Sequence, residues 1–324
     1  MIVFWAAIAS FSLLPQCAPS KRTQESLHAF FKISSSLALA VSLAFTSAFA
    51  SAQPAGTSAT PSERVQLQQI RSSTLKIIYA DTTFLIDPML AKKGTYPGFE
   101  GTYRSELRNP LVELPMPAEE VLAGVDAVIV THTHLDHWDD AAQQMLPKDL
   151  PLFLQNEADA EIIRGQGFGD VRILTDQAEF GGVTLSRIGG QHGTDKMFAT
   201  PELAEFLGVA IGVVFEAPEH KTLYLAGDTI WRDEVDQALS RYKPEVVVLN
   251  AGYAQVTGYD GAILMGKEDV LRASQAVPDA TVVATHMDAI NHMGLSRKEL
   301  KAYVQEKGIQ ERVEIPEDGA TLKF

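Results

Sequence analysis

The chain has 324 residues, of which 46% are hydrophobic and 21% are charged, and its formal net charge is -14. These values are typical of a globular enzyme with a sizeable core, and they exclude a disordered chain. The acidic balance repels a phosphate backbone, so nucleic acid is not expected as a partner. A small-molecule substrate is expected instead, and the oligomeric state stays open.

The first 52 residues differ in pattern from the rest of the chain. Three basic residues between positions 21 and 32 precede an apolar and small stretch at residues 33–50, which is followed by Ser-Ala-Gln. This order is typical of a secretory signal, so we expect cleavage near Ala50 to Ala52 and a periplasmic or secreted protein. The alternative is a membrane anchor, although the run is near the lower length limit for a span. After cleavage no stable anchor is expected.

Cys17 is the only cysteine and lies in this N-terminal extension and signal segment, residues 1–52. A chain starting near Gln53 has no thiolate, so any metal must be bound by nitrogen and oxygen. Removal of residues 1–52 leaves 24 basic against 40 acidic residues, a formal charge of -16. Residues 53–72 are predicted to be a flexible lead-in, and residues 73–324 are predicted to form a single domain.

From residue 73 onward, short strands and helices alternate. A hairpin is predicted at residues 75–79 and 83–86, and residues 92–118 are predicted to form a long surface loop because they show no sustained period. Further strands are predicted at residues 125–130, 152–154, 171–174, 183–188, 208–215, 222–226, 246–249 and 281–285. Helices are predicted at residues 140–145, 157–164, 233–242, 267–275 and 296–306. This alternation favours one α/β domain of layered sheets covered by helices.

One seven-residue run carries much of the expected chemistry. Residues 131–137 read Thr-His-Thr-His-Leu-Asp-His and follow a predicted buried strand. His132 and His134 are two positions apart on extended backbone, so both imidazoles can reach one ion. Asp136 and His137, on the following bend, can face a second ion. Histidine and carboxylate without thiolate suit zinc or another borderline divalent metal.

Three further candidates each follow a predicted strand: His192 in Gly-Gly-Gln-His-Gly, Asp228 in Gly-Asp-Thr, and His286. Side chains at separate strand ends can converge at one edge of a sheet. His292 lies six residues after His286 and is an alternative to it. Asp288 and His292 are otherwise candidates for contact with ligands or substrate, and a solvated loop is the alternative for both.

Asp87 ends the second strand of the hairpin and is predicted to orient a ligand histidine or to support its turn. Asp139 and Asp140 are predicted to be carboxylates at a helix start. The long loop contains the aromatic residues Tyr96, Phe99 and Tyr103. It is interpreted either as a substrate lid or as a packed surface flap.

The HxHxDH run, the Gly-flanked histidine, the Gly-Asp-Thr turn and the final strand-end histidine resemble the metallo-β-lactamase superfamily over residues 73–324. The hairpin ending Leu-Ile-Asp-Pro is similar to the opening hairpin of the branch that includes L-ascorbate 6-phosphate lactonase. The resemblance implies an αββα sandwich with the site at one edge of the sheets. It implies one ion on His132, His134 and His192, a second on Asp136, His137 and His286, and Asp228 bridging both.

Two divalent ions, expected to be Zn2+ with Mn2+ or Fe as alternatives, lower the pKa of a shared water from about 15.7 toward about 7. We therefore predict a dinuclear metal-dependent hydrolase that opens a small ester or lactone, with Asp136 and Asp228 as the catalytic carboxylates. A small phosphodiesterase is the alternative among hydrolases, and an antibiotic lactamase is a third. A di-iron redox protein or a metal-binding protein on the same fold is the alternative of another class.

Overall fold

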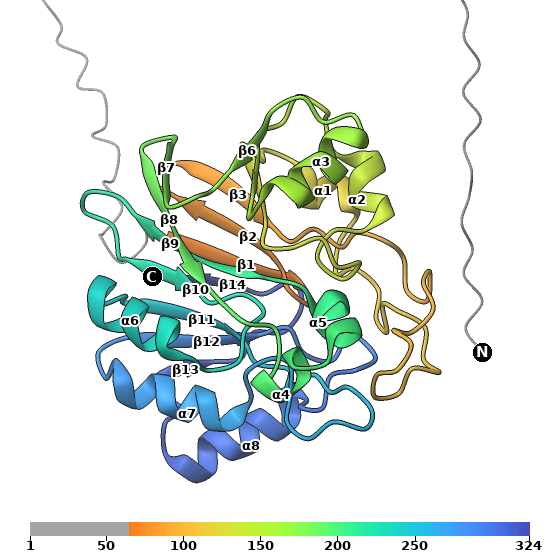
Figure 1. Cartoon of the computed structure of the whole chain (residues 1–324). Coiled ribbons are helices and arrows are strands. Elements are labelled where there is room, and N and C mark those ends of the chain that lie inside the picture. Colours follow the sequence, from red (N-terminus) through yellow and green to blue (C-terminus); the bar gives the residue numbers. More distant parts are fainter. Residues whose placement is uncertain (1–64) are drawn as a thin grey trace, which may run out of the picture. The chain divides into compact units, whose positions relative to one another are not determined.

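The computed structural model describes residues 65–324 (Figure 1). The predicted secretory signal and residues 53–64 of the predicted lead-in lie outside the described residues. Within residues 65–324, no helix combines the length and the apolar character that a membrane span needs.

Two seven-stranded sheets form the centre of the described domain. The first has the strand order β14-β1-β2-β3-β4-β5-β6, in which the pairs from β14 to β3 are antiparallel and those from β3 to β6 are parallel. Its strands are β1 (Val65–Arg71), β2 (Thr74–Tyr79), β3 (Thr82–Ile86), β4 (Ala127–Val130), β5 (Leu152–Leu154), β6 (Val171–Ile173) and β14 (Thr321–Lys323).

The second sheet has the order β13-β12-β11-β10-β9-β8-β7. Its pairs are parallel from β13 to β10 and antiparallel from β10 to β7. Its strands are β7 (Gln177–Phe180), β8 (Val183–Gly189), β9 (Ile211–Glu216), β10 (Leu223–Leu225), β11 (Val246–Asn250), β12 (Thr281–Thr285) and β13 (Val313–Glu314).

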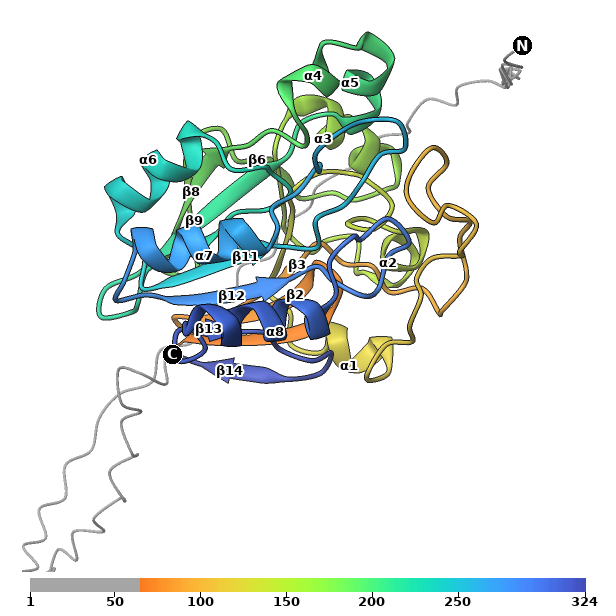
Figure 2. The same cartoon turned by 90° about the horizontal axis from the view of Figure 1, so that it is seen from below.

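Helices cover the outer faces of both sheets (Figures 1 and 2). The first sheet is covered by α1 (Ala118–Leu122), α2 (Asp140–Met145) and α3 (Glu157–Gly165). The second is covered by α6 (Asp233–Tyr242), α7 (Lys267–Ala276) and α8 (Arg297–Lys307). The inner faces share one core, in which the rings of Phe84 and Phe215 pack edge to face with their centroids 5.4 Å apart. The fold is therefore the predicted αββα sandwich, because each sheet needs apolar cover on both faces.

The prediction of a flexible lead-in is wrong over residues 65–72. Val65, Leu67 and Ile70 are fully buried, and β1 pairs with both β2 and β14. Glutamines separate these apolar residues, and the register shifts between Gln69 and Arg71, so the two-residue period is interrupted. Both features hid the strand from sequence reasoning, because such reasoning depends on an unbroken alternation. The described domain therefore includes a strand that precedes the predicted start at residue 73.

The other predicted strands and helices are present with shifts of a few residues at their ends. The hairpin of β2 and β3 is confirmed, and β9 pairs with β10 in the antiparallel direction. Besides β1, the elements that the sequence does not predict include α1, β7, α4 (Asp195–Phe198) and α5 (Pro201–Leu207). The exposed or half-buried residues of β7 give no apolar signal, and α4 and α5 span few turns.

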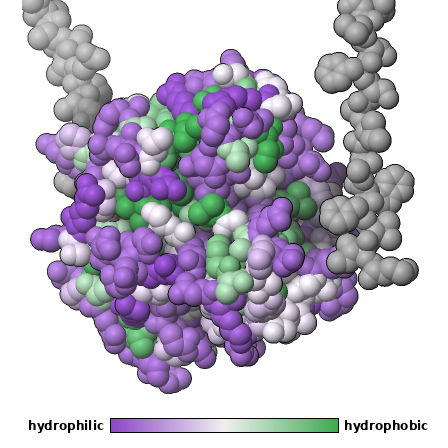
Figure 3. Space-filling model, in the orientation of Figure 1, coloured by the Kyte–Doolittle hydropathy of each residue, from purple (hydrophilic) through white to green (hydrophobic). Residues whose placement is uncertain are grey.

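Hydrophilic residues cover most of the face drawn in Figure 3, and apolar residues form small separate patches there. Among residues 65–324, the large apolar side chains that are exposed are Tyr103, Ile162, Phe206, Val209 and Tyr253. Phe206 matters most for function because it borders the site described next.

Candidate metal centre

Five strands deliver polar side chains to one edge of the sandwich. Asp87 follows β3, His132 follows β4, His192 follows β8, Asp228 follows β10, and His286 follows β12. Within each sheet these strands run in the same direction, so their carboxyl ends meet at the same edge.

All seven predicted ligands gather at this edge. Their donor atoms form three overlapping groups, and within each group the donor atoms lie within 4.8 Å of one another. The groups are His132, His134 and His192; His132, His137 and Asp228; and Asp136, His137 and His286.

Asp228 belongs to the second of these groups and lies close to histidines of the first and the third. Its Oδ2 atom is 3.1 Å from His137 Nε2, 3.5 Å from His286 Nε2 and 3.8 Å from His192 Nδ1. The other carboxylate oxygen, Oδ1, accepts a hydrogen bond of 2.6 Å from Asn250 Nδ2. This position is the one that a bridging carboxylate would need.

Each of the five clustered histidines has one ring nitrogen hydrogen-bonded to a group outside the cluster. The five pairs are His132 Nδ1 with Thr131 Oγ1, His134 Nε2 with Phe206 O, His137 Nδ1 with Asp87 Oδ2, His192 Nδ1 with Ile263 O, and His286 Nδ1 with Ser72 Oγ. These contacts fix the ring orientation and leave the second nitrogen of each ring free to act as a ligand.

Inward-facing nitrogens approach one another closely. His132 Nε2 is 3.0 Å from His134 Nδ1, and His137 Nε2 is 3.2 Å from His286 Nε2. Two ring nitrogens at this distance repel each other unless a proton or a cation lies between them. Together with the anchored outer nitrogens and the carboxylates, this arrangement fits bound divalent metal.

Burial sets the charge of three of these histidines. It lowers the pKa of His132 well below its usual value, lowers that of His134, and lowers that of His192 to about 3. The neighbouring imidazoles lower the pKa of His132 further. These rings are therefore neutral at neutral pH, and a neutral imidazole is the form that binds metal.

His137 is in the opposite situation. Burial acts to lower its pKa, but Asp228, Asp87 and Asp136 raise it well above the usual value. Burial likewise opposes the charge of Asp228, but His137 and His286 hold the pKa of its carboxyl well below the usual range. The cluster thus combines negative carboxylates with one imidazole, His137, that takes up a proton. A divalent cation can take the place of this positive charge.

Asp87 contacts the cluster through His137, at 2.9 Å. It also accepts hydrogen bonds from the backbone nitrogen and the hydroxyl of Thr131, at 2.7 and 2.8 Å. A single buried carboxylate therefore fixes both the His137 ring and the start of the turn that carries the HxHxDH run. These contacts agree with the two roles predicted for Asp87, which stay predictions.

The structure places the remaining candidate residues, Asp288, His292 and Asp139, in different surroundings. Asp288 forms an ion pair with Arg297 at 3.6 Å and accepts a hydrogen bond from its backbone nitrogen, so it faces the start of α8. His292 is buried and lines the pocket beside the metal donors. Asp139 accepts a hydrogen bond from Ala142 N at the start of α2, as predicted for a helix-start carboxylate.

The pocket beside the donors is small, with a volume of 40 Å³, and its walls are largely apolar. It is lined by Phe99, Thr102, His134, Asp136, His192, Phe206, Ile263 and His292, with no lysine or arginine among them. Sequence reasoning did not identify Phe206 or Ile263. Neither is part of a motif, and each contacts a ligand histidine through a backbone carbonyl that any residue could provide.

Asn291 attaches the long 92–118 loop to the turn that carries His292. Its side-chain oxygen accepts hydrogen bonds from Phe99 N at 3.1 Å and from Asn109 Nδ2 at 2.8 Å. Its side-chain nitrogen donates to Thr102 Oγ1 at 2.9 Å. The loop is therefore a packed flap, and Phe99 and Thr102 from it form one wall of the pocket.

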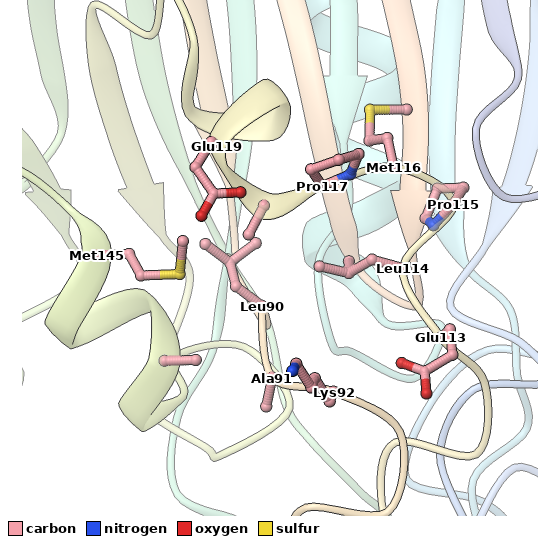
Figure 4. Close-up of a pocket in the computed structure, with 12 residues that line it drawn as sticks. Leu90, Ala91, Lys92, Glu113, Leu114, Pro115, Met116, Pro117, Glu119 and Met145 are labelled. Atoms are coloured by element: carbon pink, nitrogen blue, oxygen red, sulfur yellow. The ribbon is translucent and has the colours of Figure 1, made fainter.

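A larger pocket of 620 Å³ lies between this loop and helices α1 and α2 (Figure 4). Leu90, Leu114 and Met145 point toward its centre. None of the seven metal-ligand candidates lines it. Size therefore does not identify the reaction site here; the donor atoms do.

Residues 82–287 match the family model described as "Beta-lactamase superfamily domain". The chain belongs to this superfamily. It is 44% identical over 260 residues to the UPF0173 protein YddR of Bacillus subtilis. The aligned region covers 80% of this chain and 100% of YddR. Together with the fold and the donor cluster, this membership makes the protein a metal-dependent hydrolase.

Two solved structures are similar over most of the chain. One is described as a possible metal-dependent hydrolase from Veillonella parvula, with 48% identity and a TM-score of 0.80, covering 81% of this chain and 100% of the other. The second is an isothiocyanate hydrolase from Delia radicum gut bacteria, with 50% identity and a TM-score of 0.77, covering 80% and 99%.

Proposed function

We propose that the protein uses two divalent ions to hydrolyse small neutral carbon electrophiles, and that organic isothiocyanates are its leading substrate class. The observation that carries this proposal is a donor cluster opening onto a small pocket that has apolar side chains in its wall and no lysine or arginine. The 50% identity with an isothiocyanate hydrolase supports the substrate class.

The seven candidate ligands would hold the two ions as the sequence predicts. The group of His132, His134 and His192 supplies three nitrogen donors for one ion. Asp136, His137 and His286 supply a carboxylate and two nitrogens for the other, and Asp228 is within reach of both. Bound divalent ions lower the pKa of a shared water and supply hydroxide at neutral pH.

The walls of the pocket determine which substrates fit. Phe99, Phe206 and Ile263 offer apolar contact to a hydrocarbon substituent. The pocket has no lysine or arginine, so only the two ions could pair with the negative charge of a phosphodiester. The phosphodiesterase alternative is therefore separated by assay. Isothiocyanates, esters and lactones are neutral, so the predicted ester or lactone remains the second candidate class.

For an isothiocyanate the reaction balances with one water. The water oxygen bonds to the central carbon, the electron pair of the C=N bond moves to nitrogen, and a proton from the water follows it. The remaining acidic proton of the resulting thiocarbamic acid then moves to nitrogen, the C–N bond breaks with its electron pair going to nitrogen, and a primary amine and carbonyl sulfide are released. The side chains that line the pocket hold the substrate during this addition and exclude bulk water.

A substrate panel on the purified, metal-loaded protein tests the proposal. We expect consumption of isothiocyanates with release of amine, loss of this activity in chelator and its return on addition of zinc or manganese. Lactones, aryl esters and bis-p-nitrophenyl phosphate in the same panel separate the candidate classes. Activity that survives complete metal removal, or turnover of the phosphodiester alone, would show that the proposal is wrong.

We also propose that the mature protein acts in the periplasm or outside the cell, on the evidence of the signal pattern in residues 1–52. Cell fractionation and mass spectrometry of the mature amino terminus test this location. Cleavage near Ala50 to Ala52 is the expected result. An uncleaved protein in the cytoplasm would contradict it.

A further inference from the structure

His292 differs from the five clustered histidines in how its ring is held. Each of those five has a hydrogen-bonded outer nitrogen. His292 is only 5% exposed, and its Nδ1 atom is buried without a hydrogen-bond partner among residues 65–324. An unpartnered buried polar atom destabilises a fold, so its retention beside a reaction site points to a functional role for this ring.

The surroundings of His292 hold its ring in one place. The ring of Phe99 meets it edge to face, with centroids 5.1 Å apart. The backbone of the turn is fixed because Gln255 N donates to His292 O at 3.0 Å and Arg104 Nη2 donates to Met293 O at 2.9 Å. Asn291 ties the same turn to the 92–118 loop. The imidazole is therefore presented to the pocket by a rigid frame.

A metal-ligand role for His292 does not fit the geometry. Its nitrogens belong to none of the three donor groups, whereas His286 Nε2 does and lies 3.2 Å from His137 Nε2. His286, and not His292, therefore occupies the final ligand position. His292 nevertheless lines the pocket together with His134, Asp136 and His192.

We propose that His292 contacts the substrate directly and donates a hydrogen bond to the heteroatom that becomes the leaving group, which in an isothiocyanate is the nitrogen. This inference rests on the proposed function and assigns a residue for substrate recognition beyond the metal ligands. A neutral imidazole has one N–H donor, and a donor aimed at the substrate nitrogen stabilises the electron pair that moves there. The proton that finally binds the nitrogen comes from the water, so His292 stays neutral throughout.

Burial agrees with this role. It lowers the pKa of His292 to about 4, although Asp136 opposes the shift, so at neutral pH the ring carries one proton and no charge. A neutral donor suits a neutral substrate in a pocket with apolar walls.

Two substitutions of His292 test the proposal, with His220→Phe as a matched control. His220 lies in a turn outside the pocket, where its Nδ1 donates to Pro218 O. In His292→Phe the ring keeps its shape and loses the donor, so kcat/KM for isothiocyanates should fall by about tenfold. Metal content should not change. The thermal midpoint should stay the same or rise, because the unpartnered polar atom is gone.

His292→Gln retains an N–H donor and should keep more activity than His292→Phe. His220→Phe should leave kcat/KM and metal content unchanged. The proposal is overturned if His292→Phe keeps full kcat/KM, if it loses metal, or if its activity and thermal midpoint fall together. A wild-type protein that hydrolyses no isothiocyanate refutes the proposed substrate class; the same variants are then compared on the panel substrate that it does hydrolyse.

Discussion

The two sides of the reaction site are constructed in opposite ways. On the donor side, side chains from strand ends are held by hydrogen bonds to groups such as Asp87, Ser72 and Thr131. On the other side, the 92–118 loop presents the ring of Phe99, and the turn at residues 288–293 presents the buried imidazole of His292 with its unpartnered nitrogen. The donor side is held by its own hydrogen bonds, whereas the loop side lines the pocket in which we propose that the substrate binds. Changes on the donor side should therefore act through metal, and changes on the loop side through substrate.

The strongest test on the donor side is Asp228→Asn. The variant keeps the shape of the side chain but loses the negative charge within reach of both donor groups. Metal content and kcat/KM should fall together, the latter by more than about a hundredfold, since loss of a residue behind a ligand already costs 10–100-fold. Elemental analysis beside kinetics measures both. Retention of two ions per chain would show that the bridging assignment is wrong.

Asp87→Asn tests the support behind a ligand. His137 would lose the carboxylate that orients its ring and raises its pKa, so metal affinity or activity should fall by about 10–100-fold. Asp126→Asn is the matched control, because Asp126 accepts a hydrogen bond from Thr83 N at the opposite end of β3, away from the site. If both substitutions lowered metal affinity or activity equally, the specific support of His137 by Asp87 would be contradicted.

Asn291→Ala tests the loop side. It removes the hydrogen bonds that tie Phe99, Asn109 and Thr102 to the turn, so KM should rise by roughly 3- to 10-fold while metal content stays constant. The free energy of unfolding should fall by about 1–3 kcal/mol, because buried polar partners are left unpaired. Kinetics, elemental analysis and denaturant titration measure these effects. Loss of metal in this variant would contradict the separation of the two sides.

Asp288→Asn should have the smallest effect. Asp288 is near the site in sequence, but its side chain is 36% exposed and pairs with Arg297. Activity should stay within about twofold and stability within about 1 kcal/mol of the wild type. A substantial loss of metal would restore Asp288 as a candidate for contact with the metal ligands.

How far the sequence could predict the molecule depended on whether a feature is local. The HxHxDH run is one turn long, so its spacing alone indicates a metal site. His192, Asp228 and His286 each follow a strand whose apolar residues make it recognisable in the sequence. In contrast, β1 was missed because glutamines and a register shift interrupt its period. The pairing of Asn109 with Asn291 spans 182 positions and follows no period, so no pattern could have revealed it.

By itself, the sequence determined the fold class and the candidate metal donors, because both follow from apolar periodicity and from residue types next to strand ends. Only the tertiary structure decided that Asp288 turns away and that His292 turns inward. It also decided that Phe99 and Phe206 enclose the donors. The path of a long loop without secondary structure is set by contacts with distant residues, and those contacts exist only once the two sheets have packed together.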